Sequence, residues 1–332
     1  MNLLTPDGLD THTRPLVSVV IETITVREHS ADGQLVEKML PTLAAVRGQR
    51  YPSDRIETIV VLDDDAREDA PKLQRRCPFV TLAFASRSNY FAAKNAGARS
   101  ARGDIVALLD ADCTPDPDWL EALVSGFAPG VDVVAGRTRY TGGSLTAWTF
   151  SVSDFGNVVA TPGGAASGFN LNNVAFRREL LLAHPLDARV RRNGGCYFLY
   201  HELRAQGARI VYEPRAMVAH GLDVGGFGFV KKHFERGFDG TNVYRIDERG
   251  VLRGTRVYRR FGAPGLVALV GRRIVLDWAR LIRDRRQLGI SVFTVPYFAG
   301  VVLTIRLIEL AGGLTAVVHP DLPPRERRAS HT

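Results

Sequence analysis

One stretch, Asp104–Leu120, limits the folds open to this chain more than any other. It reads DIVALLDADCTPDPDWL, so an apolar run of strand type ends in two carboxylates that are one residue apart. In an extended backbone alternate side chains share a face, so Asp110 and Asp112 converge while Ala111 points away. The prolines and aspartates that follow end the strand and start a helix at Trp119.

Two carboxylates at a strand end are suited to a hard divalent cation. Mg2+ and Mn2+ prefer oxygen ligands, and they are typically held by one or two carboxylates together with the phosphates of a substrate. Asp110 and Asp112 therefore predict a cation site whose other ligands arrive with a phosphate-bearing molecule. A solvated turn is the alternative for an isolated pair of this kind, because short motifs recur by chance.

The segments before this stretch alternate between strand and helix types. Leu16–Glu22 and Glu57–Asp65 are rich in β-branched residues and end in acidic residues. Ser88–Gly103 is rich in small residues and favours a helix that ends at its glycine. This order predicts an open α/β fold with a mostly parallel sheet, whose ligand crevice lies outside the carboxyl ends of the strands.

The continuous block Asn89–Leu120 resembles the family 2 glycosyltransferases, which have the GT-A nucleotide-sugar fold. Its asparagine, small-residue helix, Gly-Asp, strand and DxD follow one another as in that family, and the resemblance extends from about Leu16 to His220. No G-x-G-x-x-G fingerprint follows the first strand, which argues against a dinucleotide-binding Rossmann domain. The resemblance implies a Rossmann-like, mostly parallel sheet flanked by helices, and transfer of a sugar with inversion to an acceptor hydroxyl or phosphate.

The resemblance also assigns roles to individual residues. It implies that Asp110 and Asp112 bind Mn2+ or Mg2+ and that His220, after the last strand, completes the coordination. It further implies contact with the nucleotide sugar for a set of polar residues that follow the first strands: Glu22, Thr23, Asp63, Asp64, Asn89, Lys94 and Asp110. The proline that the family usually has before Thr23 is missing. A solvated turn at Asp63 and Asp64, and an exposed helix lysine at Lys94, are the alternatives.

The chain departs from the family pattern at the catalytic base. Counting back from the Leu-x-x-x-Gly segment that begins at Leu203, the usual Glu-Asp pair falls on Gly195 and Cys196. Neither side chain can act as the usual carboxylate base, and an acceptor that is already ionised, such as a phosphate, needs none. The nearby titratable side chains are candidate substitutes: His201, Glu202, Asp154 and Asp187.

The last third of the chain differs in character. Lys231–Arg245 is basic with interleaved aromatics, and we interpret it as a loop that closes over the diphosphate or as a surface for anionic lipid. Gly271–Arg286 predicts an amphipathic basic helix, which lies in a membrane interface or packs on the catalytic domain. Ile290–Ile305 is apolar but short for a simple transmembrane helix, so we interpret it as re-entrant, interfacial or an oligomerisation surface.

These patterns divide the chain into four parts. We expect a flexible N-terminus at 1–14, a GT-A catalytic domain at 15–225, a basic and helical, membrane-associated extension at 226–318 and a disordered tail at 319–332. The polar N-terminus is not a signal peptide, which predicts a cytoplasmic protein at the inner face of the cell membrane. The three cysteines are too irregularly spaced for a disulfide framework or a zinc site.

The net charge of +8 suits anionic partners, and no recognisable nucleic-acid-binding module is present. We therefore expect a metal-dependent glycosyltransferase with a UDP- or GDP-linked donor and a carbohydrate, lipid-linked or small-molecule acceptor, with peripheral membrane contact. A non-catalytic protein that binds nucleotide sugars or lipid head groups is the main alternative, supported by the missing Glu-Asp pair. A nucleotidyltransferase has less support, because no glycine-rich, lysine-bearing loop follows the first strand.

Overall fold

A computed structural model describes residues 14–27, 33–86, 89–141, 145–221, 226–286 and 288–320. The predicted flexible N-terminus and disordered tail therefore lie almost entirely outside the described residues. The chain divides into two compact units, each built from interleaved segments. The described residues of the sheet unit are those within Met1–Arg139, Ala160–Leu186 and Ala208–Gly221, and those of the helical unit lie within Tyr140–Val159, Asp187–Gly207 and Leu222–Thr332.

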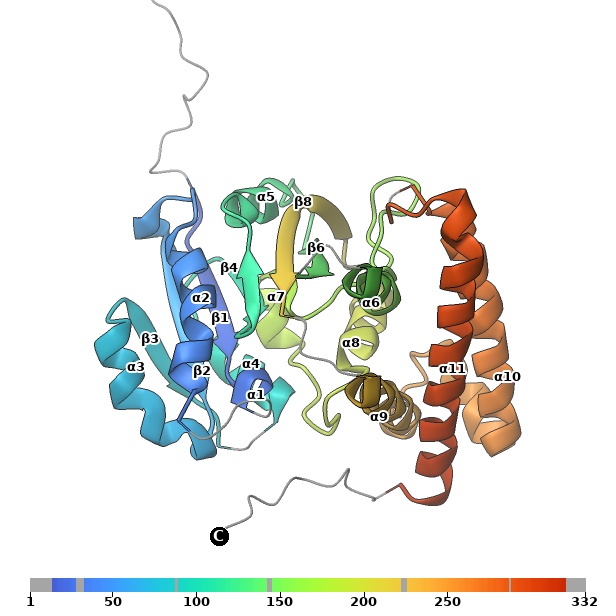
Figure 1. The fold of residues 1–332 in the computed structure, drawn as a ribbon. Helices are drawn as coiled ribbons and strands as arrows, with labels where there is room; N and C mark the ends of the chain where they lie inside the picture. Colours follow the sequence, from blue (N-terminus) through green and yellow to red (C-terminus); the bar gives the residue numbers. More distant parts are fainter. Residues whose placement is uncertain are drawn as a thin grey trace, which may run out of the picture. The chain divides into compact units, whose positions relative to one another are not determined.

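An eight-stranded sheet, in the order β3-β2-β1-β4-β7-β6-β8-β5, organises the sheet unit. Figure 1 labels its strands β1 to β4, β6 and β8. The strands of the sheet are β1 (Val17–Glu22), β2 (Ile56–Leu62), β3 (Val80–Phe84), β4 (Ile105–Asp110), β5 (Cys113–Pro115), β6 (Val133–Tyr140), β7 (Asn173–Arg177) and β8 (Ile210–His220). The first four strands of the order pair in parallel, whereas β7 is antiparallel to β4 and to β6, and β5 is antiparallel to β8. The predicted α/β sheet is confirmed, with an antiparallel part added beyond β4.

Helices cover both faces of the parallel strands. The helical elements of this unit are α1 (Ile24–Arg27), α2 (Leu35–Arg47), η2 (Ser53–Arg55), η3 (Asp64–Asp69), α3 (Ala70–Arg76), α4 (Tyr90–Ser100), α5 (Trp119–Ser125) and α7 (Arg178–Ala183). Side chains alternate along β1, so Val19 lies in the core cluster that contains the α2 side chains, while Val20 faces α4. A Cβ at Gly97 of α4 would overlap Val20 and Val61, so glycine lets this helix approach the sheet closely.

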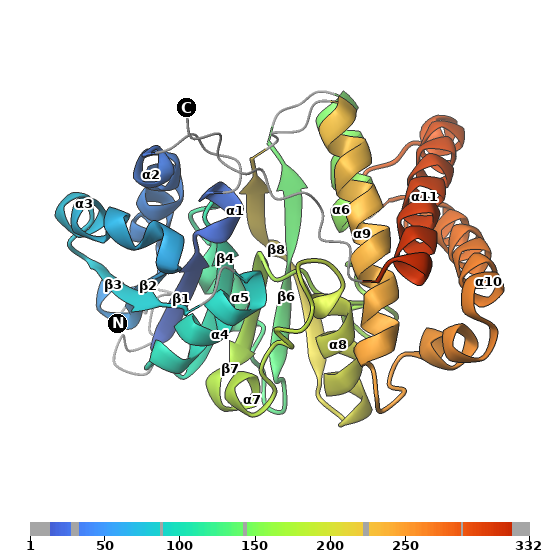
Figure 2. The same cartoon turned by 90° about the horizontal axis from the view of Figure 1, so that it is seen from below.

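The helical unit contains α6 (Leu145–Phe155), α8 (Gly195–Ala205), α9 (Gly226–Ile246), α10 (Arg253–Arg283), η4 (Val292–Thr294) and α11 (Val295–Val318). α10 and α11 lie side by side in both views (Figures 1 and 2). α9 and α11 pack closely because both carry glycines at the contact. A Cβ at Gly237 would overlap the backbone of Glu309, and a Cβ at Gly312 would overlap that of Phe234.

Two expectations about individual elements are wrong, and strand β8 accommodates a proline. β8 runs without a break through Pro214. Its pairing with β5 begins only at Val218, so the backbone N–H that proline lacks is not needed for the hydrogen bonds between these two strands. Lys231–Arg245 lies inside helix α9 and is not a loop. The apolar run that begins at Ile290 continues as helix to Val318, because the charged residues within it are buried and paired with each other.

Within the described residues, Val292–Val318 is 27 residues long and contains an 18-residue window with a mean hydropathy of 1.9, enough by length and composition to cross a membrane. Arg306 and Glu309 lie in the middle of this segment and are buried. Arg306 also pairs with Asp277 of α10, at 2.7 Å between nitrogen and carboxylate oxygen. The polar face of α11 is therefore turned into the helical unit.

Candidate functional site

The carboxyl ends of parallel strands bring distant acidic residues to one edge of the sheet. The register of β1 sets Glu22 beside Asp110 of β4 on one side and beside Val61 of β2 on the other. Asp63 follows β2 directly. Three acidic residues from separate parts of the sequence thus occupy the edge at which open α/β sheets bind ligands.

A buried lysine holds Asp110 in place. Lys94 of α4 is fully buried, and its Nζ donates to Asp110 Oδ1 at 2.7 Å and to the carbonyl oxygens of Leu109 at 3.2 Å and Leu171 at 3.0 Å. The hydroxyl of Tyr90 donates to the same Asp110 oxygen at 2.9 Å. An ammonium group has three protons, so these acceptors use all of them. The alternative of an exposed helix lysine is wrong, and Lys94 is placed to orient Asp110.

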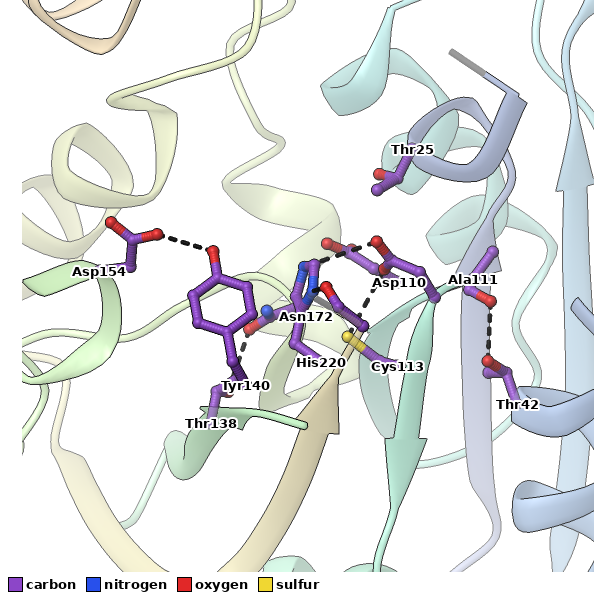
Figure 3. A network of polar contacts seen from close by, with 12 residues as sticks. Thr25, Thr42, Asp110, Ala111, Cys113, Thr138, Tyr140, Asp154, Asn172 and His220 are labelled. Atoms are coloured by element: carbon purple, nitrogen blue, oxygen red, sulfur yellow. Dashed lines mark hydrogen bonds and ion pairs between the residues drawn. The ribbon is translucent and has the colours of Figure 1, made fainter. Parts of the chain in front are cut away.

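The pairing of β5 with β8 brings His220 to Asp112. Cys113 lies directly opposite His220 in the antiparallel register, and His220 Nε2 is 3.6 Å from Asp112 Oδ2 (Figure 3). The Nδ1 of His220 lies 2.8 Å from the carbonyl oxygen of Gly221. When Nδ1 carries the proton and donates it to that carbonyl, Nε2 presents its lone pair as a ligand.

Together these contacts form a set of side chains that fits a divalent cation. Asp110, Asp112, Cys113 and His220 each offer a ligand atom, and the four atoms lie within 4.8 Å of one another. The side chains of Asp112 and His220 are 26% and 16% exposed, so this side of the cluster is open to solvent. Carboxylate oxygens suit Mg2+ or Mn2+, and an imidazole nitrogen suits Mn2+ better.

Two predicted nucleotide contacts are engaged with neighbouring parts of the fold. Glu22 is fully buried and accepts hydrogen bonds from the backbone N–H of Thr25 at 3.1 Å and from its hydroxyl at 2.5 Å. The hydroxyl of Thr23 donates to the carbonyl oxygen of Val61 at 2.9 Å. These bonds fix the turn that follows β1 at the ligand edge.

The next two predicted contacts lie at the start of the helical turn η3, which Asp63 caps. Asp63 is fully buried, accepts from the N–H of Ala66 at 3.1 Å and pairs with Arg27 at 2.7 Å. Asp64 is exposed and pairs with Arg67 at 3.1 Å. Asp63 is therefore not part of a solvated turn, whereas the side chain of Asp64 is open to solvent.

Asn89 caps α4. Its side-chain oxygen accepts from the N–H groups of Phe91 at 3.0 Å and Ala92 at 2.9 Å. This cap starts the helix that carries both Tyr90 and Lys94, so Asn89 fixes where those two side chains meet Asp110.

The candidate bases lie on α8 of the helical unit. The helix begins at Gly195, as the counting predicts, with Gly194 in a left-handed conformation at φ 92°. Burial and the nearby Arg253 lower the pKa of His201, whose ring packs on that of Tyr197 with centroids 4.4 Å apart. Glu202 pairs with Arg249 at 3.2 Å.

The other two carboxylates named from the sequence are engaged in ion pairs. Asp187 pairs with Arg189 at 2.8 Å. Asp154 is buried, pairs with Lys232 at 2.6 Å and with Arg236 at 2.9 Å, and accepts from the hydroxyl of Tyr140 at 2.7 Å (Figure 3). Burial alone would raise the pKa of Asp154, but Arg236 and Lys232 outweigh it and hold the pKa well below its usual range. A carboxylate held in this way is a poor proton acceptor.

Residues 36–181 match the model of glycosyl transferase family 2. The glycosyltransferase AglE of Haloferax volcanii is 33% identical over 139 residues, which are 40% of this chain and 42% of that protein. The glucosyl-dolichyl phosphate glucuronosyltransferase of the same organism is 24% identical over 236 residues, which are 62% of this chain and 69% of that protein. The dolichol-phosphate mannosyltransferase of Pyrococcus furiosus is 27% identical over 139 residues, 40% of this chain and 36% of that protein. The match thus spans less than half the length of the first and third of these relatives.

The fold is also found in a solved structure. A mannosyltransferase from Pyrobaculum calidifontis, in complex with GDP-mannose and Mn2+, superposes with a TM-score of 0.58. The superposition covers 94% of this chain and 90% of that one, at 19% sequence identity. This likeness establishes a GT-A-like fold.

Removal of the Lys94 ammonium tests its role in holding Asp110. We expect Lys94→Met to lower the free energy of unfolding by about 3–5 kcal/mol, because it leaves Asp110 as a buried carboxylate without its counter-charge. Urea unfolding followed by circular dichroism measures this. The matched control is Lys72→Met, which breaks the exposed pair with Glu37 and should leave the free energy of unfolding nearly unchanged. Equal costs for the two variants would contradict the role assigned to Lys94.

Proposed function

We propose that this protein, whose residues 36–181 match the model of glycosyl transferase family 2, transfers a sugar from a nucleoside diphosphate sugar to an acceptor. The convergence of Asp110, Asp112 and His220 at the carboxyl ends of the strands carries this proposal, since these donors fit a divalent cation that also binds a diphosphate. We further propose that the reaction depends on the cation and inverts the anomeric carbon.

In this proposal the protein supplies fixed charge where the bond to the diphosphate breaks. A bound divalent cation would neutralise the leaving diphosphate. Lys94 and Tyr90 hold Asp110 in one orientation before the substrate arrives, so the site needs little reorganisation during the reaction. Asp112 and His220 are the members of the cluster that remain partly open to the substrate side.

A UDP- or GDP-linked donor and a lipid-linked phosphate acceptor are the substrates we propose. The structural neighbour binds GDP-mannose, and the names of two relatives contain dolichol or dolichyl phosphate. A phosphate acceptor is also compatible with the sequence departure at Gly195 and Cys196, where the family pattern has its carboxylate base. A phosphate oxygen is already ionised at neutral pH and can attack without losing a proton to the protein.

Sugar transfer tests the proposal directly. With Mn2+ and a polyprenyl phosphate, we expect transfer of radiolabelled sugar from one member of a panel of UDP- and GDP-sugars. Asp112→Asn should lower kcat/KM by about 100-fold or more, the loss typical of removing a group that stabilises developing charge. The control is Asp118→Asn, which changes an exposed carboxylate of the same segment. Nucleotide-sugar binding with neither transfer nor donor hydrolysis would favour the non-catalytic alternative.

The absence of a base is tested separately. We expect His201→Ala and Glu202→Ala to keep kcat within about threefold of the parent protein with a phosphate acceptor, whereas loss of a general base typically costs about 100-fold or more. Steady-state kinetics at saturating acceptor measure this. A large drop in kcat in either variant, with donor and acceptor binding intact, would identify that residue as the base and refute the ionised-acceptor proposal.

We also propose that α10 and α11 contact a membrane surface. Large apolar side chains of these helices and of η4 are exposed: Phe261, Val267, Val275, Leu276, Trp278, Ile282, Val292, Phe293, Tyr297, Leu303, Leu307 and Val318. We name this set the C-terminal apolar surface. Exposed arginines, among them Arg272, Arg273 and Arg286, lie on or just after α10. Apolar side chains combined with arginines suit the interface of a bilayer that contains anionic lipids.

Vesicle binding tests this surface. We expect the double variant Ile282→Glu, Phe293→Glu to weaken co-sedimentation with vesicles of phosphatidylglycerol and phosphatidylcholine at least about tenfold, since each side chain gains about 1.5–3 kcal/mol when it leaves water. Ile282 is 62% exposed and Phe293 is 91% exposed, so the unbound fold should tolerate both changes. The control is Phe84→Glu, an exposed aromatic of the sheet unit. Equal binding by all three proteins would contradict a membrane role for this surface.

A further inference from the structure

Cys113 lies inside the proposed cation site. Its side chain is fully buried, and its Sγ is 3.8 Å from Asp112 Oδ1. Directly opposite residues of an antiparallel pair point to the same face, so the thiol and the imidazole of His220 share one side of the sheet. Figure 3 shows the sulfur of Cys113 close to the ring of His220 and below Asp110.

The thiol changes the chemistry of the site. Two carboxylates and one imidazole are suited to Mg2+ or Mn2+, whereas thiolate sulfur selects softer ions such as Zn2+ and Cd2+. The spacing of the cysteines along the chain gives no sign of this, because the other donors come from the residues before Cys113 and from the distant strand β8. A buried core thiol with no role at the metal is the competing explanation.

We propose that Cys113 supplies a sulfur ligand to this site, which therefore binds soft divalent ions through Sγ, the His220 imidazole and the Asp112 carboxylate. On binding, the S–H proton leaves to solvent and a sulfur lone pair forms the bond to the ion. Soft ions then compete with the hard cation at one place. The inference rests on the location of the cation site in the proposed function, but it does not rest on sugar transfer.

Cadmium is the probe, because a sulfur–cadmium bond gives an ultraviolet charge-transfer band. We expect the full chain to show this band on addition of Cd2+, and we expect Mn2+ in excess to remove it. Cys113→Ser and Cys113→Ala should abolish the band and weaken Cd2+ binding at least about tenfold, by a larger factor than they weaken Mn2+ binding. Cys77→Ser and Cys196→Ser, which change the other two cysteines, should keep the band.

The possible failures are distinguishable. A band that persists in both folded Cys113 variants, or that excess Mn2+ does not remove, would overturn the inference. Binding of Mn2+ and a nucleoside diphosphate with no cadmium band would also overturn it while leaving the proposed function intact. A Cys113-dependent band in a protein that binds no Mn2+ would support the sulfur ligand and contradict the proposed function. Two Cys113 variants are used so that the test can still be made if one of them fails to fold.

Discussion

The buried ion pair between Lys94 and Asp110 is the interaction on which the candidate site depends. Removing two charges from water is costly, and a buried pair is tolerated only when its remaining hydrogen-bonding capacity is satisfied. Here Leu109 and Leu171 accept the other two protons of the ammonium, and Tyr90 adds a donor to the carboxylate. The carboxylate of Asp110 is thereby held in a fixed position at the end of β4, close to the side chains of Asp112 and of His220 at the end of β8.

The helical unit uses buried charge in a similar way. Burial alone would raise the pKa of Glu309, but Arg306 holds it well below its usual range, and Arg306 also pairs with Asp277. These charges are paired inside the unit, whereas the exposed positions of α10 and α11 include large apolar side chains and, on α10, arginines. The proposed membrane contact rests on this combination of exposed apolar and basic side chains.

Local patterns made the central part of the fold predictable. The β-branched strands, the small-residue helix and the paired carboxylates at the end of β4 are each recognisable from a few consecutive residues, and the family resemblance based on them is confirmed over 36–181.

The burial of Lys94 was missed, because a lysine in a helix is usually exposed. Its immediate neighbours Ala93, Asn95 and Ala96 are also buried. The available signal in the sequence was the run of small residues around Lys94, which lets a helix pack against other elements on several sides. The helical form of Lys231–Arg245 was missed because its charges pair with a residue far away in the sequence, Asp154, which contacts both Lys232 and Arg236.

The most direct test of the account is the linkage between the cation and the diphosphate. The electron paramagnetic resonance signal of free Mn2+ gives the fraction bound, and the titration is run with and without GDP or UDP. Binding linkage is reciprocal, so a shared site predicts that one of these nucleotides tightens Mn2+ binding at least about tenfold and that Mn2+ tightens nucleotide binding by the same factor. Asp112→Asn should abolish the effect. An Mn2+ affinity that no nucleoside diphosphate changes would contradict a cation site built to hold a nucleotide sugar.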